Sequence, residues 1–476
     1  MNLSPKERAA IPQQDMPTQD ARERIHNTHE VALGYTEEMA RLEANRCLQC
    51  KTRPCMEGCP VSIDIPGFIH AIAEGRDKDA IGIIKQTSLL PSICGRVCPQ
   101  EKQCMKNCTV GKMAKDPMKA VCIGRLERYA ADKERAEGTA GAPAIAPATG
   151  KRVAVIGGGP AGLTVAADVR RAGHEVVLFE AFHKAGGVLM YGIPEFRLPK
   201  AIVEAEIDGL RKMGVEIRED FAIGRSRKLK DLLEKDGFDA AFVGTGAGLP
   251  KFMGIPGENF VGVFSANEYL TRANLMKAYD AEHADTPIRR GGRVAVLGGG
   301  NVAMDATRTA LRLGAEKVYL VYRRSESEMP ARKEEIEHAK EEGVEFHLLQ
   351  NAVRVLGDEN DVVTGLECVR FELGEPDASG RRRPVQVPNS EFTLDVDTVV
   401  VAVGNGSNPL ITETTEGLVA NEKGNLIVDP ETNMTSIPGV FAGGDIVLGA
   451  ATVILAMGEG RRAAAGILKY LEGKNK

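Results

Sequence analysis

Residues 153–163 read VAVIGGGPAGL, an apolar stretch that runs into a glycine-rich turn and then into a helix-forming segment. The turn contains Gly157, Gly159 and Gly162 in the spacing GxGxxG. In this arrangement the first glycine permits a tight bend, the second lets a pyrophosphate approach the backbone, and the third lets the helix pack closely on the strand. The amides at the helix N-terminus then face the phosphates. We predict a dinucleotide site at this turn.

The flanking sequence has the strand–helix–strand order that such a site requires, with strands predicted over 152–156 and 175–179 and a helix over 161–172. Glu180 ends the second strand, 18 residues after Gly162. A carboxylate at this position accepts hydrogen bonds from ribose hydroxyls and repels a 2′-phosphate. The alternative interpretation is a glycine-rich turn that binds no ligand.

The same unit occurs a second time, 141 residues further along the chain. Residues 294–314 read VAVLGGGNVAMDATRTALRLG, with Gly298 and Gly300 in the first two positions of the fingerprint and Ala303 in the third. Strands are predicted over 293–297 and 317–322, with a helix from residue 302 to residue 313. Two copies of one supersecondary unit predict two dinucleotide domains.

The second copy differs where its last strand ends, because Arg323 and Arg324 take the place of an acid. Guanidinium groups at this position suit a 2′-phosphate through charge and forked hydrogen bonds. We therefore expect NADP(H) rather than NAD(H) at the second site, with Arg332 as a further candidate contact. The alternative is a solvated basic pair on the surface.

Residues 435–464 read TSIPGVFAGGDIVLGAATVILAMGEGRRAA and place Gly444 and Asp445 directly after a strand predicted over 439–442. The segment resembles the closing FAD motif of flavoproteins with two dinucleotide domains, in which the aspartate holds the ribityl chain. A helix predicted from about residue 451 would direct its N-terminal dipole at the flavin. With Glu180, this motif assigns FAD to the first site and the nicotinamide nucleotide to the second. The alternative role of Asp445 is a helix cap.

Composition divides the chain into three parts. Residues 138–150, GTAGAPAIAPATG, have the composition of a linker between a helix-rich part and a part in which strands and helices alternate. The apolar strands within 238–247 and 396–405 are interpreted as the exit from the first dinucleotide domain and the return to it. We predict an α/β fold with two Rossmann-like dinucleotide-binding domains, the second inserted in the first, preceded by an α-helical iron–sulfur domain. The predicted bounds are 1–145 for the helical domain, 146–287 and 397–476 for the FAD-binding domain, and 288–396 for the NADP(H)-binding domain.

Nine of the ten cysteines lie between Cys47 and Cys122, in the part where helices are predicted over 36–48 and 65–73. Disulfide frameworks are typical of small secreted domains, whereas crowded thiols in a reducing compartment more often bind metal. The first run has the spacing C-x2-C-x4-C-x3-C-P and consists of Cys47, Cys50, Cys55 and Cys59. The second run has the spacing C-x3-C-x5-C-x3-C and consists of Cys94, Cys98, Cys104 and Cys108.

The cysteine that precedes proline in such a run serves the other cluster in two-cluster ferredoxins. By that logic one iron–sulfur cluster is held by Cys47, Cys50 and Cys55, and Cys59 helps to hold a second. The alternatives are structural zinc, for which only the first pair has the usual spacing, and free thiols.

Together these motifs resemble the small (β) subunit family of NADPH-dependent glutamate synthase. The resemblance covers nearly the whole chain and includes CGRVCP, IGRLERYAAD, GGGPAGL, GGVLMYGIPEFRLPK, GGGNVAMD, YRR, MPAR and FAGGD. The same module is similar to the N-terminal part of dihydropyrimidine dehydrogenase, to the large subunit of NADH-dependent ferredoxin:NADP oxidoreductase and to the flavoprotein chain of sulfide dehydrogenase.

The resemblance implies two [4Fe-4S] clusters that take ligands from both runs. One cluster would be held by Cys47, Cys50, Cys55 and Cys108, and the other by Cys59, Cys98, Cys104 and Glu127. Cys94 is expected to be buried without a metal role, and Cys122 departs from the family, so both stay alternatives to Glu127 as the fourth ligand. The resemblance also places Gly187 and Arg197 at FAD and Gly404 near the nicotinamide nucleotide.

No cysteine pair follows the first fingerprint, and Cys368 stands alone, so the clusters are the available outlet for electrons. We expect hydride transfer from NADPH to FAD and then single-electron steps through the clusters, without a catalytic side chain. The resemblance implies the electron-delivering subunit of glutamate synthase, in glutamate biosynthesis, with a separate large subunit as partner. The alternatives are the NADP-binding subunit of a ferredoxin:NADP oxidoreductase or sulfide dehydrogenase, with a smaller flavin and iron–sulfur partner, and a redox sensor without turnover.

Bulk composition excludes other classes of function. The formal net charge is −5 and the isoelectric point about 6.0, which gives no footprint for nucleic acid. No apolar run reaches the roughly 18 residues of a membrane span, and the first 27 residues are polar and charged. We expect a cytoplasmic protein that contacts neither nucleic acid nor membrane.

Overall fold

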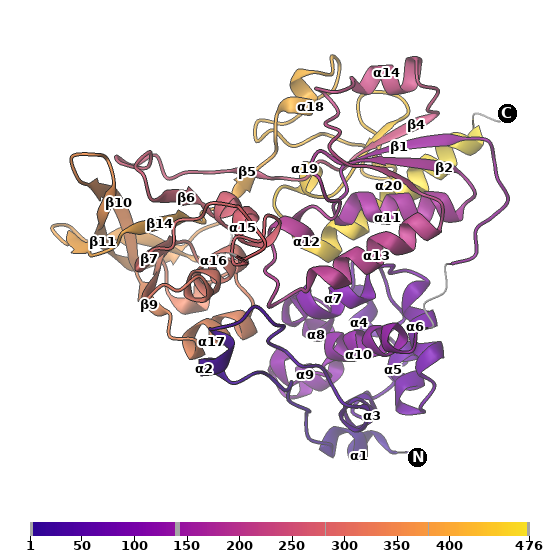
Figure 1. Cartoon of the computed structure of the whole chain (residues 1–476). Coiled ribbons are helices and arrows are strands. Elements are labelled where there is room, and N and C mark those ends of the chain that lie inside the picture. The colour runs from indigo at the N-terminus through magenta and orange to yellow at the C-terminus, as the bar shows by residue number, and fades with distance from the viewer. Residues whose placement is uncertain (1–2, 139–142, 281, 379, 474–476) are drawn as a thin grey trace.

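The computed structural model describes residues 3–138, 143–280, 282–378 and 380–473. In Figure 1 a helical region, residues 3–138, lies below two α/β domains, the first at the upper right and the second at the left. Among the described residues, no helix combines the length and apolar character needed to cross a bilayer.

The helical region contains short helices connected by tight turns. α3 (Glu37–Asn45) begins after Thr36, whose hydroxyl accepts from the Met39 amide, and α5 begins after Asp64, which accepts from the Gly67 amide. The remaining helix bounds in this region are α1 (Pro5–Ala10), α2 (Ala21–Arg24), α4 (Pro54–Glu57), α5 (Ile65–Ala73), α6 (Asp77–Lys85), α7 (Pro91–Val97), α8 (Cys104–Asn107), α9 (Thr109–Met113) and α10 (Ile123–Ala136), with 3-10 turns η1 (Gln100–Lys102) and η2 (Pro117–Lys119).

The first sheet is parallel, with the strand order β16-β4-β1-β2-β3. Successive residues of a strand point to opposite faces, and the two faces bury different helices. One face packs on α11, α13 and α20 and shares a single core with the helical region, whereas the other packs on α14, α18 and α19. The bounds are β1 (Arg152–Ile156), β2 (Glu175–Phe179), β3 (Glu216–Arg218), β4 (Ala240–Val243), β16 (Val440–Ala442), α11 (Pro160–Arg171), α12 (Val188–Tyr191), α13 (Lys200–Lys212), α14 (Leu229–Glu234), α18 (Leu410–Glu413), α19 (Asp445–Leu448) and α20 (Val453–Gly473).

The second sheet is also parallel, with the order β6-β14-β7-β8-β9. Its helical face packs on α15, α16 and α17, and its other face packs on an antiparallel sheet in which Cys368 is buried. The bounds are β6 (Val263–Ser265), β7 (Arg293–Leu297), β8 (Lys317–Tyr322), β9 (Glu345–Leu348), β10 (Gln350–Gly357), β11 (Val363–Pro376), β12 (Arg382–Gln386), β13 (Phe392–Leu394), β14 (Thr398–Val401), α15 (Ala266–Asn274), α16 (Asn301–Arg312), α17 (Lys333–Glu341) and the turn η3 (Glu326–Glu328).

The predicted fold class is confirmed, but two domain boundaries are misplaced, the first by β6 and α15 and the second by β14. β6 and β14 pair with each other and belong to the second sheet, although the bounds at 288 and 397 assign both strands to the first domain. An apolar strand that ends in small residues looks the same whichever sheet it joins, so its sequence does not show the partner. The chain crosses between the domains on an antiparallel ribbon of β5 (Leu249–Pro250) and β15 (Asn405–Gly406).

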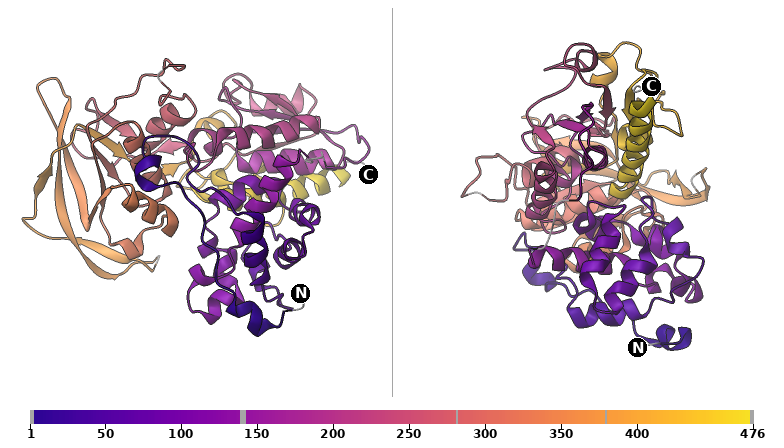
Figure 2. Two further views of the ribbon diagram at one scale, coloured as in Figure 1. Left: turned by 60° about the horizontal axis from the view of Figure 1, so that its bottom comes forward. Right: turned by 90° about the vertical axis from the view of Figure 1, so that its right-hand side faces the viewer.

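An N-terminal arm crosses from the helical region onto the second α/β domain, where α2 lies against α17 (Figures 1 and 2). Arg24 is 1% exposed; its Nε atom lies 2.7 Å from Glu342 and its Nη2 atom 2.7 Å from Glu341. The arm also touches the first domain, because the Val31 amide donates to the Phe196 carbonyl (2.9 Å). All three parts of the molecule therefore meet at this arm.

Replacing Arg24 by alanine should loosen this arm. The change removes charged hydrogen bonds worth about 2 kcal/mol in total, which corresponds to roughly thirtyfold faster amide exchange over residues 17–32 by local opening. Hydrogen-exchange mass spectrometry measures this effect. Arg22→Ala, at an exposed position of the same helix, is the matched control. Equal amide exchange in the two variants would contradict the role of the Arg24 ion pairs in holding the arm.

Candidate functional site

The first glycine turn has the geometry that its sequence predicts. It connects β1 to α11, and a Cβ atom at Gly162 would lie 1.9 Å from the carbonyl oxygen of Gly157. No side chain fits at that distance, so α11 packs on the turn only because residue 162 is glycine. Gly159 is the residue before α11 and leaves the helix N-terminus open to a ligand.

Glu180 lies beside this turn, at the end of β2. One carboxylate oxygen accepts from the Gly158 amide (2.8 Å) and the other from the Phe182 amide (2.9 Å). The residue is 5% exposed, and burial raises the pKa of its carboxyl group. Gly187 packs over the turn, since a Cβ atom there would lie 2.9 Å from the Gly159 Cα atom.

Asp445 reaches the same turn from the far end of the chain. It is the first residue of α19, and Gly444 packs against Ala161 in the first turn of α11. Burial raises the pKa of Asp445 to about 6. The expected helix is present as α20, which begins at Val453. Residues more than 250 positions apart thus converge at one turn, as the assignment of FAD to this domain requires.

Tyr191 was missed in the sequence, although it lies in the GGVLMYGIP segment. Burial raises the pKa of its phenol to about 12, and the charges of Asp445 and Glu180 add to this shift. The phenol therefore lies in the electrostatic field of both acids. An aromatic residue four positions after Gly187 was the available signal, but only the fold brings it to the acids.

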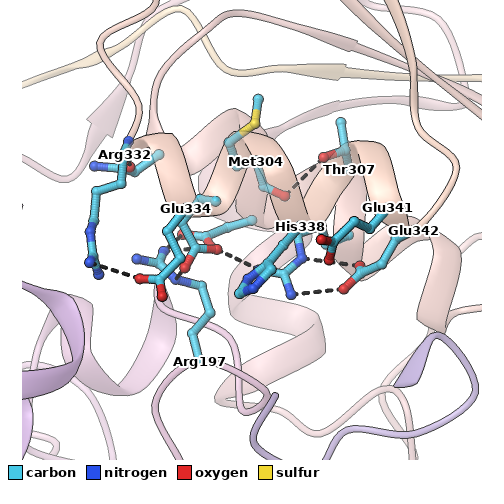
Figure 3. Close-up of polar contacts among 12 residues, drawn as sticks. Arg197, Met304, Thr307, Arg332, Glu334, His338, Glu341 and Glu342 are labelled. Carbon is cyan, nitrogen blue, oxygen red and sulfur yellow. Dashed lines mark hydrogen bonds and ion pairs between the residues drawn. The ribbon is translucent and has the colours of Figure 1, made fainter. Parts of the chain in front are cut away.

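Arg197 points away from the first glycine turn and into the second domain. Its Nη1 atom lies 2.6 and 2.8 Å from the two carboxylate oxygens of Asp305, and its Nε atom lies 3.0 Å from Glu335. Figure 3 shows its guanidinium below α16 and α17. The contact with FAD stays a prediction, because these two acids hold the guanidinium in the structure.

Arg197 is one end of a buried chain of ion pairs that reaches the N-terminal arm (Figure 3). Arg308 contacts Glu335 and lies 2.8 Å from Glu342, which also pairs with Arg312 and Arg24. Burial opposes ionisation of Glu335, yet Arg197 and Arg308 hold its pKa down at about 2. These ion pairs border a cavity of about 330 Å³ between the helical region and the helices α16 and α17.

The second glycine turn connects β7 to α16, with Gly298 against the carbonyl oxygen of Ala402 and Gly300 directly before the helix. Ala303 is buried in the first turn of α16. Gly404 lies in the exposed loop after β14, the neighbour of β7 in the sheet. The structure therefore places these four residues at the carboxyl ends of two neighbouring strands, β7 and β14.

The two arginines after β8 have different surroundings. Arg323 is exposed, whereas Arg324 is 6% exposed, pairs with Asp377 at 2.6 Å and donates to the Arg382 carbonyl at 2.9 Å. Arg324 thus fastens the β11–β12 hairpin. The prediction of a 2′-phosphate contact therefore rests on Arg323 alone, because Asp377 and the Arg382 carbonyl hold the Arg324 guanidinium.

Arg332 is also not directed at that strand end. Its Nη1 atom donates to the Arg96 carbonyl (2.9 Å) and its Nη2 atom pairs with Glu334 (2.9 Å), so its side chain reaches toward the helical region. The suggestion that it joins the 2′-phosphate is wrong for the side-chain position that the structure shows.

The first predicted cluster set comes together around one small cavity. Cys47, Cys50, Cys55 and Cys108 all line a space of about 20 Å³. Cys50 Sγ lies 3.2 Å from Thr109 Oγ1, which brings the first cysteine run beside the second. Burial raises the pKa of the Cys47 thiol to about 11 and of the Cys55 thiol to about 12.

The second set consists of Cys59, Cys98, Cys104 and Glu127. Burial raises the pKa of Cys104 well above its usual range, and the nearby Cys59, Cys98 and Glu127 raise it further. Glu127 is 6% exposed, and within the described residues its Oε1 atom has no hydrogen-bond partner. A buried, unpaired carboxylate oxygen is costly, so a bound cation fits this position.

The two alternatives to Glu127 have other contacts. Cys94 is fully buried, as predicted, and its Sγ atom lies 3.4 Å from Met457 Sδ. Cys122 accepts from the Gln13 amide (3.3 Å), and its own backbone amide donates to Glu43. The contacts of Cys122 make it the weaker alternative, whereas the Cys94 thiol also interacts with Cys98 of the second set. Glu127 and Cys94 both stay candidates for the fourth ligand.

Over the described ranges of the chain, no three His, Cys, Asp or Glu side chains meet closely enough to hold one metal ion. The sulfurs of a zinc site lie about 4 Å apart, since each is roughly 2.3 Å from the metal. The four ligands of a [4Fe-4S] cluster bind four different iron atoms and are spread more widely.

Two family descriptions match the chain. Residues 24–139 match dihydropyrimidine dehydrogenase domain II, 4Fe-4S cluster, and residues 151–460 match pyridine nucleotide-disulphide oxidoreductase. The glutamate synthase [NADPH] small chain of Halomonas elongata is 39% identical over 97% of this chain and 97% of its own length. The corresponding chain of Escherichia coli is 38% identical over 92% and 93%.

The chain is also 41% identical to the NADP(+)-dependent formate dehydrogenase subunit beta of Moorella thermoacetica, over 88% of this chain, but it spans only 60% of that protein. Among solved structures, FprA of Mycobacterium tuberculosis in complex with NADPH covers 69% of this chain, and 86% of FprA is matched, with a TM-score of 0.57 and 18% identity. This likeness shows the fold of the two α/β domains.

Arg323→Ala should weaken NADPH binding by about tenfold to a hundredfold, because it removes a charged hydrogen bond to the 2′-phosphate. NADH binding should hardly change. Titration of each nucleotide measures the two dissociation constants and so the change in preference for NADPH over NADH. Arg324→Ala is the matched control, since it perturbs the hairpin without touching the phosphate; a larger loss of NADPH preference in Arg324→Ala would contradict the assignment.

Cys50→Ala should lose one cluster and keep FAD, leaving about four of about eight iron atoms per chain. Cys122→Ala should keep all of them, because its side chain lies in another environment. Iron and flavin analysis of anaerobically purified protein measures both. Full iron content in Cys50→Ala, or loss of iron in Cys122→Ala, would refute the ligand sets.

Proposed function

The chain belongs to the family of glutamate synthase [NADPH] small chains, and we infer that it is the subunit that oxidises NADPH and delivers the electrons to a separate large synthase subunit. It is an iron–sulfur flavoprotein oxidoreductase of the pyridine nucleotide-disulphide oxidoreductase family. When bound, FAD accepts hydride from NADPH, and [4Fe-4S] clusters carry single electrons.

The observation that carries this proposal is that the segments carrying the second cysteine set pack against α20 and the residue that precedes it. Gln103, the residue before Cys104, donates to Thr452 Oγ1 at 3.4 Å. A Cβ atom at Gly458 would lie 3.0 Å from the carbonyl oxygen of Pro60, the residue after Cys59. Because α20 closely follows Asp445, these contacts support a route from the proposed FAD site to the second set.

The first cysteine set continues the route away from α20. Its cavity is lined by residues of the helical region, such as Ile69 of α5 and Val110 of α9. Cys47 and Cys50 are partly exposed, whereas Cys98 and Cys104 are buried. We therefore order the proposed path as FAD site, second set, first set and protein surface.

The other residues of the proposed site would bind and orient the two dinucleotides. Glu180 and Asp445 hold hydrogen-bond acceptors beside the first glycine turn, and the exposed Arg323 supplies positive charge at the second. A dithiol outlet has no candidate near the FAD site, since Cys368 is buried under the second sheet. Electron delivery through the helical region follows from this arrangement.

The partner distinguishes the remaining candidates. The chain matches 97% of one glutamate synthase small chain, which supports a synthase large subunit as partner. The second candidate partner is a subunit of another NADP-dependent oxidoreductase, because the formate dehydrogenase relative is also a beta subunit. Reduced thiols in the cluster sets are consistent with a cytoplasmic location.

Anaerobic addition of NADPH to the purified holoprotein should bleach the flavin and then produce the electron-paramagnetic signal of a reduced cluster. Adding a glutamate synthase large chain with glutamine and 2-oxoglutarate should yield glutamate. Dithionite-treated protein is the positive control for the cluster signal. A flavin that NADPH leaves oxidised would contradict the oxidoreductase proposal and favour a sensor, whereas NADPH-reduced protein without glutamate formation would exclude only the synthase partner.

A further inference from the structure

A group of lysines stands out against the acidic character of the chain. Residues 102–119 contain five lysines and one acid, Asp116, although the whole chain carries a net charge of −5. Lys106, Lys112 and Lys115 of this segment are exposed, and so is Lys51 from the first cysteine run. We call these four side chains the lysine face.

The lysine face surrounds the first cysteine set. Lys51 follows Cys50 directly, and Cys108 lies between α8, which carries Lys106, and α9, which carries Lys112. The contact of Cys50 with Thr109 holds these segments together. In the part of the chain that the structure describes, none of the four ammonium groups has an ion-pair partner.

An apolar side chain lies within this face. Met113, the last residue of α9, is 64% exposed and is followed by the exposed Ala114 and Lys115. A single exposed methionine is common, but one next to Lys112 and two residues before Lys115 adds an apolar side chain to a charged surface, a composition found at docking surfaces.

Position adds a third argument, which rests on the proposed function. The segments that carry the second cysteine set pack against α20 and Thr452, so electrons that follow the proposed path reach the first set last. An acceptor protein must then approach the surface nearest to Cys47 and Cys50, which is where the lysine face lies.

We propose that the lysine face, together with the exposed Met113, is the docking surface for an electron-accepting protein or subunit whose contact surface is acidic. Unpaired cations around an electron exit attract a negatively charged partner and orient it, at little cost in desolvation because they stay at the rim. Each NADPH oxidised to NADP⁺ and a proton supplies two electrons, which reduce two molecules of a one-electron acceptor. Interaction of this face with nucleic acid is disfavoured by the acidic charge of the chain as a whole.

Cytochrome c and succinylated cytochrome c test this proposal, because the two haem proteins differ mainly in the sign of their surface charge. Under anaerobic conditions and at low salt, NADPH-dependent reduction should be faster with the acidic, succinylated form. Lys106→Glu/Lys112→Glu should lower that rate by about tenfold or more and reduce its dependence on salt. Binding of the oxidised succinylated protein, measured without NADPH, should weaken in parallel.

Lys423→Glu/Lys469→Glu is the matched control, since both lysines are exposed outside the helical region. It should leave the preference for the acidic acceptor unchanged. Equal rates in the two double variants, or no preference in the parent protein, would overturn the docking surface. Flavin bleaching by NADPH separates the two proposals, because it should be normal in every variant even where the docking surface is wrong.

Discussion

The packing of α20 is the constraint on which the rest of the structure depends. This helix contacts α11 so closely that a Cβ atom at Gly460 would lie 2.7 Å from the carbonyl oxygen of Ala161, and on another side Gly458 meets Pro60 of the helical region. One helix therefore positions the first glycine turn, α19 with its first residue Asp445, and the segments of the second cysteine set relative to one another. Electron transfer between sites needs a fixed separation, and a helix packed on both sides provides it without hinges.

The second α/β domain is held by electrostatics rather than by a continuous apolar core. The ion pairs that connect Arg24, Arg197 and Glu342 across three parts of the chain are buried, and such pairs add little net stability but are costly to break singly. They therefore favour one orientation of this domain. Their cost is shared, because Glu342 pairs with three arginines and Arg308 with two acids.

The sequence predicted the repeated elements well and the side-chain environments poorly. β1, β2, β7 and β8 have the predicted bounds because each is a short apolar run that ends at a glycine turn, as in β1 and β7, or at a charged residue, as in β2 and β8. The partner of β14 and the direction of Arg197 depend on contacts between distant segments, which local pattern does not contain. Arg323 and Arg324 are adjacent in sequence, yet only the β11–β12 hairpin makes one of them structural.

The predicted cluster ligands bear on how the helical region is stabilised. Its helices are short, and its core includes thiols and the unpaired Glu127 carboxylate, which burial penalises in their charged forms. Apolar residues at these positions would stabilise an empty fold better. Iron bound by these groups would compensate for their lost hydration, so we expect cluster binding and folding of this region to be thermodynamically linked. By this argument, bound clusters would connect the short helices α4, α8 and α9, whose own hydrogen bonds are few.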